Sequence, residues 1–399
     1  MNGVLLSNRV SYDPIGGYNQ VMAAPYIHEL PGWPDFTWDT NAFALPLARV
    51  HFRRGALITA MASLGFDVRQ DTVLSVLVQD VTKSSEIEGE HLDEQQVRSS
   101  IAQHLGMDIA GLPHADRDVE GVVQMMLDAT QRYDDPLDAE RLFSWHAALF
   151  PTGRSHLRKI IVASWRDDRA GPMLVLSGRE PKQKVHYQAP DATLVPDAMQ
   201  HFLSWFEEAS LDPVVQAAVA HLWFVTIHPF DDGNGRIARA LTDLALARAD
   251  GTAQRFYSMS AQLRRDRKRY YEILEKTQKG GLDITAWITW FIEHLQAALD
   301  AAQSVVRGVR NRQAFWDAHH DVALNTRQIK MLNKLLDGDF KSKLQTQKYA
   351  AVTGTSAASA KRDLADLVHK GILMPAPGTS GRGTHYLLIT GESSSSCTW

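Results

Sequence analysis

Apolar residues along this chain recur mainly with the three-to-four-residue spacing of an amphipathic α-helix, and alternating strand patterns are few and short. The stretch DTVLSVLVQDVTKSSEIE illustrates the pattern. Asp71 can cap this helix, Gly89 can end it, and its apolar face holds Val73, Leu74, Leu77 and Val81. The spacing therefore predicts a mostly α fold, in which residues 1–120 form an N-terminal helical domain containing a helix over about 71–90.

The stretch from Gly153 to Pro190 departs from this helical pattern. It contains three short apolar runs, IIVAS, PMLVLSG and KVHYQAP, separated by Gly, Pro and charged residues. Such runs are typical of strands, and we expect a β-hairpin flap on a helical body. Helices then resume, because Asp212 and Pro213 supply a cap and a first-turn residue for the apolar run 214–227.

The last part of the chain has a different charge and a different pattern. Residues 324–390 carry ten Lys or Arg and four Asp or Glu, a net +6, so the remainder of a chain with net charge −4 carries −10. Their order of helix, short helix, turn, helix and Gly-rich hairpin is typical of a winged helix-turn-helix domain. We expect residues 301–323 to form a linking helix and residues 391–399 a disordered tail.

A basic surface is expected on the winged-helix domain, and it leaves two kinds of partner open. Many winged helices bind DNA, while others bind proteins or dimerise. The residues that would form this surface are Lys341, Lys343, Lys348, Lys361, Arg362 and Arg382.

The cysteine content and the length of the apolar runs indicate the cellular compartment in which the protein works. Cys397 is the single cysteine of the 399 residues, which excludes internal disulfides and Cys-based zinc sites. No apolar run approaches the roughly 18 residues needed to cross a bilayer. The start, MNGVLLSNRVSYDP, lacks a basic region followed by an apolar core. We expect a cytoplasmic protein without membrane contact.

One stretch, HPFDDGNGRIAR, combines the groups that phosphate transfer requires. His228 can take a proton near neutral pH, and Asp232 can hold Mg²⁺ or Mn²⁺. The glycines of 233–235 let backbone amides face a ligand at the start of a helix, where negative charge is favoured. Arg236 and Arg239 lie three residues apart, on one face of that helix.

Three other interpretations of this stretch fail. GNGRIA fits a dinucleotide-binding motif, but a helix precedes it where a strand is required. As a calcium loop it would place Phe230 and Leu241 where Asp and Glu are needed. The chain contains no G-x-x-x-x-G-K-[ST] motif, so it has no P-loop.

The stretch resembles the signature of Fic-domain proteins, H-P-F-x-[DE]-G-N-G-R-x-x-R, at every fixed position. The resemblance implies a mostly helical Fic core, placed at residues 121–300, with a β-hairpin flap that holds an extended segment of a target protein. It also implies transfer of AMP from ATP to a Tyr, Thr or Ser hydroxyl of that protein.

The resemblance assigns roles to individual residues. His228 would be the general base, Asp232 would hold the metal, and Arg236 and Arg239 would bind the β- and γ-phosphates. Flap residues 175–187 would pair with the target. The residues implied to bind ATP and its phosphates are Gly233, Asn234, Gly235, Arg236, Ile237, Ala238, Arg239, Tyr270, Tyr271 and Gln278, the last three at the adenine.

A second motif lies upstream. SSEIEG fits the family's inhibitory-helix signature, [ST]-x-x-x-E-[GN], whose fixed positions here are Ser84, Glu88 and Gly89. Three glutamates, at 86, 88 and 90, crowd a helix C-terminus, where negative charge is unfavourable, and this suggests a cationic partner. The resemblance implies that Glu88 pairs with Arg239 and takes the place of the γ-phosphate.

The sequence therefore predicts a protein adenylyltransferase restrained by its own Glu88. Two alternatives stay open: a phosphodiesterase that uses the same site to remove AMP from modified proteins, and a DNA-binding regulator whose Fic domain senses nucleotides. Self-modification and a homodimer are also left open, as are the target protein and the preferred base.

Overall fold

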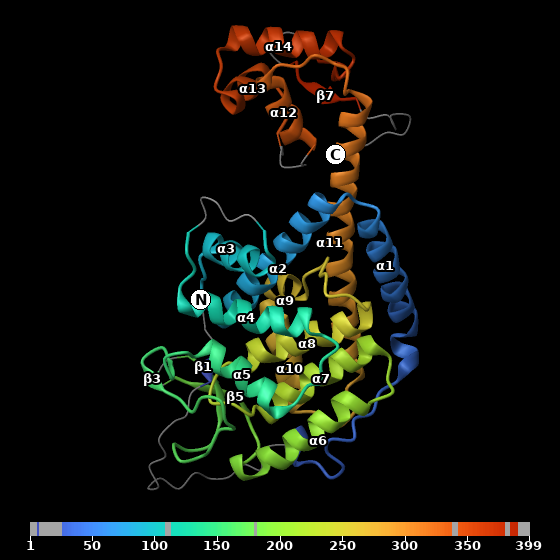
Figure 1. Cartoon of the computed structure of the whole chain (residues 1–399). Helices are drawn as coiled ribbons and strands as arrows, with labels where there is room; N and C mark the ends of the chain where they lie inside the picture. The colour runs from blue at the N-terminus through green and yellow to red at the C-terminus, as the bar shows by residue number, and fades with distance from the viewer. Residues whose placement is uncertain are drawn as a thin grey trace. The chain divides into compact units, whose positions relative to one another are not determined.

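The computed structural model describes residues 6–7, 26–107, 113–178, 182–336, 342–379 and 384–389. The chain forms two compact units, Met1–Ala302 and Gln303–Trp399. Helices dominate both units, and the strands are short (Figure 1). The predicted mostly α fold is therefore confirmed. Within the described ranges no helix is both long enough and apolar enough to span a bilayer.

Ten α-helices are described entirely within the first unit, and an eleventh continues into the second. The ten are α1 (Ala44–Ala62), α2 (Phe66–Glu88), α3 (Glu94–His104), α4 (Arg117–Gln131), α5 (Ala139–Leu149), α6 (Val195–Glu208), α7 (Pro213–Ile227), α8 (Asn234–Asp250), α9 (Met259–Arg265) and α10 (Arg267–Gln278). The eleventh is α11 (Thr285–Ala318), and the 3-10 helices are η1 (Ile27–Glu29), η2 (Thr40–Ala42) and η3 (Ala192–Leu194).

The described strands form three small antiparallel sheets. β1 (Leu6–Ser7), β4 (Leu174–Ser177) and β5 (Lys184–Gln188) pair in the order β1-β4-β5. β2 (Arg154–Ser155) pairs with β3 (Arg158–Lys159), and β6 (Leu373–Pro375) pairs with β7 (Tyr386–Leu388). The β4–β5 hairpin is the expected flap. The run IIVAS forms no strand, which corrects the prediction for it: Ile160 is buried, and residues 161–164 form an irregular segment.

Helices α7 and α8 lie at the centre of the first unit (Figure 1). Because α7 is apolar on almost every side, it must be buried all round rather than along one stripe. All of its residues except Pro213 and Gln216 are buried. The cap predicted for it is present, since the Asp212 side chain accepts hydrogen bonds from the backbone amides of Val214 and Val215. The cap holds the start of α7, and burial on almost every side holds the rest of the helix as far as Ile227.

Helix α2 begins earlier than predicted. It starts at Phe66, directly after Gly65, so Asp71 lies inside the helix rather than capping it. No helix-breaking residue separates Phe66 from Asp71, and the helix therefore extends back to the glycine. Its predicted end is confirmed, because Gly89 adopts a left-handed φ of 87° and donates to the carbonyl of Glu86.

Two further helices differ from the sequence pattern. The sequence of residues 263–278, LRRDRKRYYEILEKTQ, predicts one continuous helix, but the structure divides it at Asp266 into α9 and α10. The linking helix expected at 301–323 is the second half of α11, which runs without interruption from Thr285 to Ala318.

The second unit contains α12 (Thr326–Leu336), α13 (Thr346–Thr353) and α14 (Ala357–His369), followed by the β6–β7 hairpin. They pack around a small apolar core that includes Met331, Leu332, Tyr349, Leu364 and Leu367. Lys343, Lys348, Lys361 and Arg362 are exposed. Lys341, Arg382 and the tail 391–399 lie outside the described residues.

The close packing of α4 against α5 gives a test of this fold. A Cβ added at Gly121 would lie 1.8 Å from the backbone carbonyl oxygen of Ala148, so the two helices would have to separate. We expect Gly121→Ala to lower the free energy of unfolding by about 1–3 kcal/mol in denaturant titrations. Gly55→Ala is the matched control, because no atom lies within 4 Å of its added Cβ in α1. Its helix propensity should raise stability by up to about 1 kcal/mol, and equal effects of the two changes would contradict the packing.

Candidate functional site

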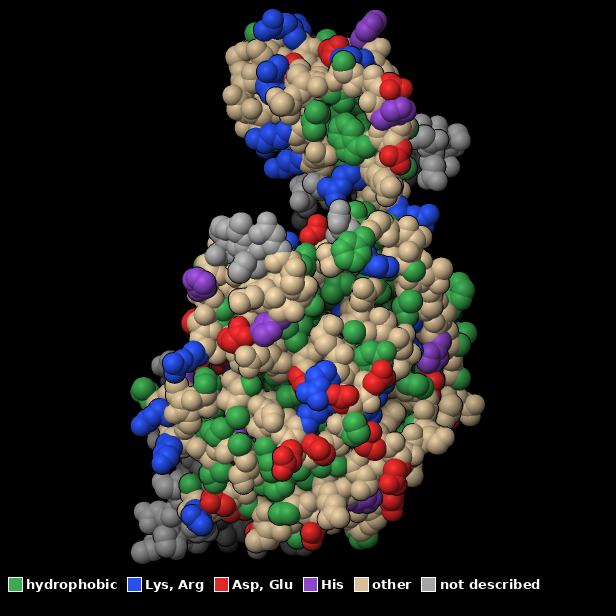
Figure 2. Space-filling model, in the orientation of Figure 1, with side chains coloured by type: hydrophobic (Ala, Val, Ile, Leu, Met, Phe, Trp, Pro, Cys, Tyr) green, Lys and Arg blue, Asp and Glu red, His purple; other side chains and the backbone are tan. Residues whose placement is uncertain are grey.

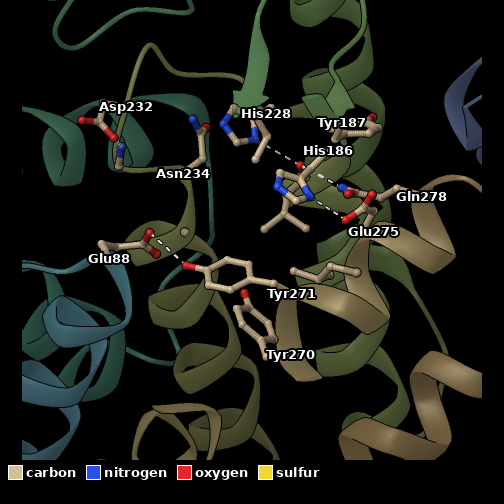
Figure 3. A pocket seen from close by; sticks show the side chains of 15 residues that line it. Glu88, His186, Tyr187, His228, Asp232, Asn234, Tyr270, Tyr271, Glu275 and Gln278 are labelled. Atoms are coloured by element: carbon tan, nitrogen blue, oxygen red, sulfur yellow. Dashed lines mark hydrogen bonds and ion pairs between the residues drawn. The ribbon is translucent and has the colours of Figure 1, made fainter. Parts of the chain in front are cut away.

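A pocket of about 780 Å³ in the first unit gathers most of the predicted site residues (Figure 3). The pocket lies among the flap, α10, the end of α2 and the loop between α7 and α8. Its lining residues are Glu88, Val175, His186, Tyr187, Val225, His228, Asp232, Gly233, Asn234, Gly235, Tyr270, Tyr271, Leu274, Glu275 and Gln278.

His228 ends α7 in a left-handed conformation, with φ 53° and ψ 59°. Its Nδ1 lies 3.2 Å from the carbonyl oxygen of Val225, and because a carbonyl only accepts, Nδ1 carries the proton. Nε2 is buried and has no hydrogen-bond partner among the described residues. Burial lowers the pKa of His228 to about 4, and nearby Arg166 acts in the same direction. The imidazole is therefore neutral near pH 7, with the lone pair of Nε2 available.

Arg166 fixes the backbone at this point and was not found from the sequence. Its side chain is fully buried. Nε donates to the carbonyl of His228 at 2.8 Å, and Nη1 pairs with Asp168 at 2.9 Å. The backbone amide of Arg166 donates to the carbonyl of Pro229 at 2.9 Å. An arginine in an irregular segment carries no sequence signal of burial, so only the folded chain reveals this contact.

The loop after His228 is closed by Asn234. Its side chain donates to the carbonyl of Phe230 at 2.8 Å and accepts from the amide of Phe230 at 3.0 Å. The side-chain amide is thus engaged within the loop, and Asn234 can offer a ligand only its backbone. Gly233 precedes α8 with φ 80°, a conformation that favours glycine. The backbone amides in the first turn of α8 lack intrahelical partners, and Asn234 and Gly235 of this turn line the pocket.

Asp232 is held as an ionised carboxylate. Burial alone would raise its pKa, but the charge of Arg236 and hydrogen bonds from Ser155 and the Gly233 amide keep the pKa below its usual range. Ser155, on β2, donates from Oγ to Asp232 Oδ2, and the Gly233 amide donates to Oδ1 at 2.6 Å. Ser155 was also not found from the sequence, because it lies 77 residues away from its partner.

His146 on α5 supports the same loop from behind. Ala163 donates its amide to Nδ1 at 3.2 Å, so the proton resides on Nε2, which donates to the carbonyl of Asp232 at 3.2 Å. Burial lowers the pKa of His146 to about 4, and its ring stacks on Phe230 with centroids 4.2 Å apart. Two neutral histidines with opposite tautomers therefore flank the loop.

The donor set suits a divalent cation that is shared with a substrate. Among the described residues, no group of three or more His, Cys, Asp or Glu side chains forms a cage for a metal. Asp232 is an ionised carboxylate of the loop and lines the pocket. Mg²⁺ commonly binds through one or two carboxylates together with substrate phosphates and water. Asp232 could hold such an ion when a phosphorylated substrate supplies the other oxygens.

Both motif arginines pair with glutamates, one at the last residue of α2 and one just after the helix ends. Arg239 Nη2 lies 2.8 Å from Glu88 Oε1, and its Nε donates to Ser84 Oγ at 2.8 Å. Arg236 Nη1 lies 2.7 Å from Glu90 Oε2. The predicted contact between Glu88 and Arg239 is therefore present, whereas the partner of Glu90 was not predicted. Gly235 leaves room for Glu88, since a Cβ there would lie 2.2 Å from Glu88 Oε1.

The three residues predicted to contact the adenine belong to α10 and line the pocket. Tyr270 is buried, and its hydroxyl lies 2.8 Å from His221 Nε2. The hydroxyl of Tyr271 lies 3.4 Å from Glu88 Oε2, and Gln278 lies 3.3 Å from Thr226 Oγ1. All three side chains are visible around the pocket in Figure 3.

Four of the ten residues that were predicted to bind ATP or its phosphates do not line the pocket, namely Arg236, Ile237, Ala238 and Arg239. The side chains of Ile237 and Ala238 are fully buried in the core and do not line the pocket. Their backbone belongs to the first turns of α8.

Two parts of the chain match known families. Residues 136–246 match the Fic/DOC family, and residues 26–107 match a domain of unknown function, DUF4172. The chain therefore carries a Fic domain, which contains the loop, α7 and most of α8.

Curated relatives resemble only part of the chain. The protein adenylyltransferase Fic of Drosophila grimshawi is 34% identical over 110 residues, which cover 28% of this chain and 21% of the relative. That of Aedes aegypti is 34% identical over 105 residues, 26% of this chain and 19% of the relative. The match thus spans about a fifth of these relatives.

Solved structures of Fic proteins were also matched. A Fic family protein from Desulfovibrio desulfuricans G20 has a TM-score of 0.48 and 19% identity, covering 86% of this chain and 96% of that one. Fic-1 from C. elegans, residues 134–508, has a TM-score of 0.46 and 20% identity, and the match covers 67% of this chain and 74% of that one.

The histidine geometry can be tested by nitrogen-detected NMR of labelled protein. At pH 6–7 we expect His228 to be neutral with its proton on Nδ1, and His146 to be neutral with its proton on Nε2. Both rings should begin to protonate only as the pH approaches about 4. His228→Gln and His146→Gln assign the two signals. The same tautomer in both rings, or protonation of either at pH 6.5, would contradict the site as described.

Proposed function

We propose that this chain is a protein adenylyltransferase, which transfers AMP from ATP to a Tyr, Thr or Ser hydroxyl of a target protein and is restrained by Glu88. One observation carries the proposal. A neutral histidine with a free, buried Nε2 shares a pocket with the start of α8, where Arg239 is paired with a carboxylate. A base beside an anion-binding helix start is what transfer of a phosphoryl or nucleotidyl group to a hydroxyl requires.

Unsatisfied donors beside the Glu88 carboxylate support a phosphate site. Arg239 Nη1 and Arg236 Nε are buried and have no hydrogen-bond partner among the described residues. Buried guanidinium donors are costly when they are left unpaired. Phosphate oxygens would satisfy them, and Arg239 Nη1 lies near the position that a Gly235 side chain would occupy.

The residues of the chain then have defined tasks. His228 Nε2 takes the proton of the target hydroxyl as its oxygen attacks the α-phosphorus, and the bond to pyrophosphate breaks. The amides at the start of α8 and the two arginines stabilise the charge that develops on the departing pyrophosphate. Asp232 would hold Mg²⁺, which supplies further charge neutralisation at the phosphates. Tyr271 and Gln278 would contact the adenine.

Glu88 competes with this arrangement. Arg239 is 1% exposed, and its charge is neutralised by Glu88. While that pair persists, the γ-phosphate cannot take the same guanidinium edge. ATP would then bind in a pose in which the target hydroxyl and pyrophosphate are not in line across the α-phosphorus. Removal of the carboxylate should therefore raise transfer rather than binding alone.

Labelling with α-³²P nucleoside triphosphates tests the proposal. We expect Glu88→Gly to label itself or proteins of a cell extract at least about 10-fold faster than the native chain, with ATP preferred among the four triphosphates. Glu86→Gly is the matched control, because Glu86 lies on the same helix and pairs with Lys83 and Arg264 instead of a motif arginine. Its labelling should stay at the native level. His228→Ala on the Glu88→Gly background should abolish the label.

The outcomes separate the alternatives. Label that survives His228→Ala contradicts the general-base role. Release of AMP from an already modified protein by the native chain, without labelling by Glu88→Gly, indicates removal of AMP at the same site, with Glu88 placing a water. No label from any triphosphate with either chain would refute transfer of a nucleotide.

The second unit supports a second function, DNA binding. Its acidic Asp363 and Asp366 are paired with Arg327 and Lys370, whereas four exposed cations have no acidic partner among the described residues. These four are Lys343, Lys348, Lys361 and Arg362. An excess of unpaired cations on a helical unit is the electrostatic pattern of a nucleic-acid surface.

Gel-shift titrations of the full chain test this second function. We expect duplex DNA binding whose affinity falls as salt rises from about 50 to 200 mM, and the double variant Lys361→Ala/Arg362→Ala should weaken it and flatten the salt dependence. Arg49→Ala, an exposed arginine on α1, is the control and should leave binding unchanged. Absence of salt-sensitive binding would remove DNA as a partner.

A further inference from the structure

The small β2–β3 hairpin is fixed to the loop that carries Asp232. Ser155 donates to Asp232 Oδ2, Arg158 Nη2 donates to the carbonyl of Asp231 at 3.2 Å, and the amide of Ile161 donates to Asp231 Oδ2 at 3.0 Å. Three bonds join one side of the hairpin to two consecutive loop residues. The hairpin is therefore a rigid projection beside the reacting groups.

The tip of this hairpin exposes an apolar side chain. Leu157 is 93% exposed, the highest value among the large hydrophobic residues described as exposed. The preceding residue, His156, has a φ of 53°, which is unfavourable for a residue other than glycine. Arg154 Nη1 donates to the carbonyl of Leu157 at 2.9 Å and holds the turn. Strained backbone of this kind clusters at functional sites, and here the turn holds Leu157 out in solvent.

Exposed cations lie beside Leu157 on the hairpin and also on the flap. Arg154 and Lys159 are exposed and have no acidic partner among the described residues, and the same holds for Lys182 at the flap. Lys184, also on the flap, reaches Glu275 only at 3.4 Å. Figure 2 shows Lys and Arg side chains along the edge of the first unit where Figure 1 labels β3.

Three acidic groups of the site are engaged in ion pairs. Glu88 and Glu90 pair with the motif arginines, and Glu275 pairs with Lys279 at 2.7 Å and with His186 at 2.6 Å. The charged residues of the hairpin itself are Arg154, Arg158 and Lys159, and all are basic, so its exposed leucine lies in a positively charged segment.

We propose that the β2–β3 hairpin and the flap lysines form a docking surface for an acidic segment of the target protein, with Leu157 as its apolar anchor. The inference rests on the proposed function and adds the chemistry of its partner. The cations attract a segment rich in Asp and Glu, and an apolar side chain of that segment covers Leu157. The bonds to Asp231 and Asp232 fix this segment beside the hydroxyl that reacts. A nucleic-acid backbone offers nothing apolar to cover the leucine.

Fluorescent peptides test docking without relying on the reaction. Each peptide has 15 residues with one Tyr, one Thr, one Ser and one Leu, and its other positions are rich in Asp and Glu, rich in Lys and Arg, or neutral. We expect the native chain to bind the acidic peptide at least about 10-fold more tightly than either of the others, as measured by anisotropy. This preference should shrink when salt rises from about 50 to 300 mM, because the charges are exposed.

Variants assign the effect to the hairpin. Arg154→Glu/Lys159→Glu should remove the preference for the acidic peptide, and Leu157→Ser should weaken its binding with little change in salt dependence. Arg49→Glu, which reverses an exposed arginine on α1, is the control and should bind as the native chain does. On the Glu88→Gly background, the hairpin variants should raise KM for the peptide about 10-fold while leaving KM for ATP and kcat unchanged.

The results distinguish docking from function. Equal affinity for the acidic and basic peptides, or equal effects of Arg49→Glu and the hairpin variants, would overturn the docking surface even if labelling succeeds. Preferential binding of the acidic peptide without any labelling would support docking and refute adenylyl transfer. Stronger binding to single-stranded RNA or to vesicles of anionic lipid than to the acidic peptide would assign the surface to another partner and overturn the proposal.

Discussion

A buried guanidinium on α8 is the constraint on which the arrangement of the site depends. Arg239 is 1% exposed, and burial of an unpaired charge costs far more than a fold of ordinary stability can tolerate. Some group must therefore supply negative charge at that place. Here Glu88 and Ser84 supply it from α2, so the end of α2 is drawn onto the start of α8. The same requirement makes the position suitable for a phosphate, because any anion that displaces Glu88 meets a cation already stripped of water.

Features that depend on neighbours in the chain could be predicted from the sequence. The motif loop, the Asp212 cap, the Gly89 stop and the apolar face of α2 all follow from residues within one or two helical turns of each other. The contact between Glu88 and Arg239 spans a much longer separation, and only the resemblance to a known family suggested it. Local physics predicted that glutamates crowded at a helix end need a cation, but could not say which cation.

Features that depend on distant segments could not be predicted. Arg166, Ser155 and His146 each contact the motif loop from 60 to 90 residues away, through hydrogen bonds to carbonyls or to a single carboxylate. Nothing in their own surroundings distinguishes them from solvated residues. The division of the helix at Asp266 and the earlier start of α2 at Phe66 were missed for a related reason, since packing decides where marginal helix ends lie.

The backbone of His228 bears on how this protein balances stability against chemistry. A left-handed conformation disfavours a residue with a Cβ by about 1–2 kcal/mol relative to glycine, the residue that commonly ends helices in this way. The chain accepts that conformational cost in order to put an imidazole at the end of its most buried helix. Residues better suited to the backbone there would relax the fold and remove the base. At position 228, a substitution that makes the protein more stable would therefore make it less reactive.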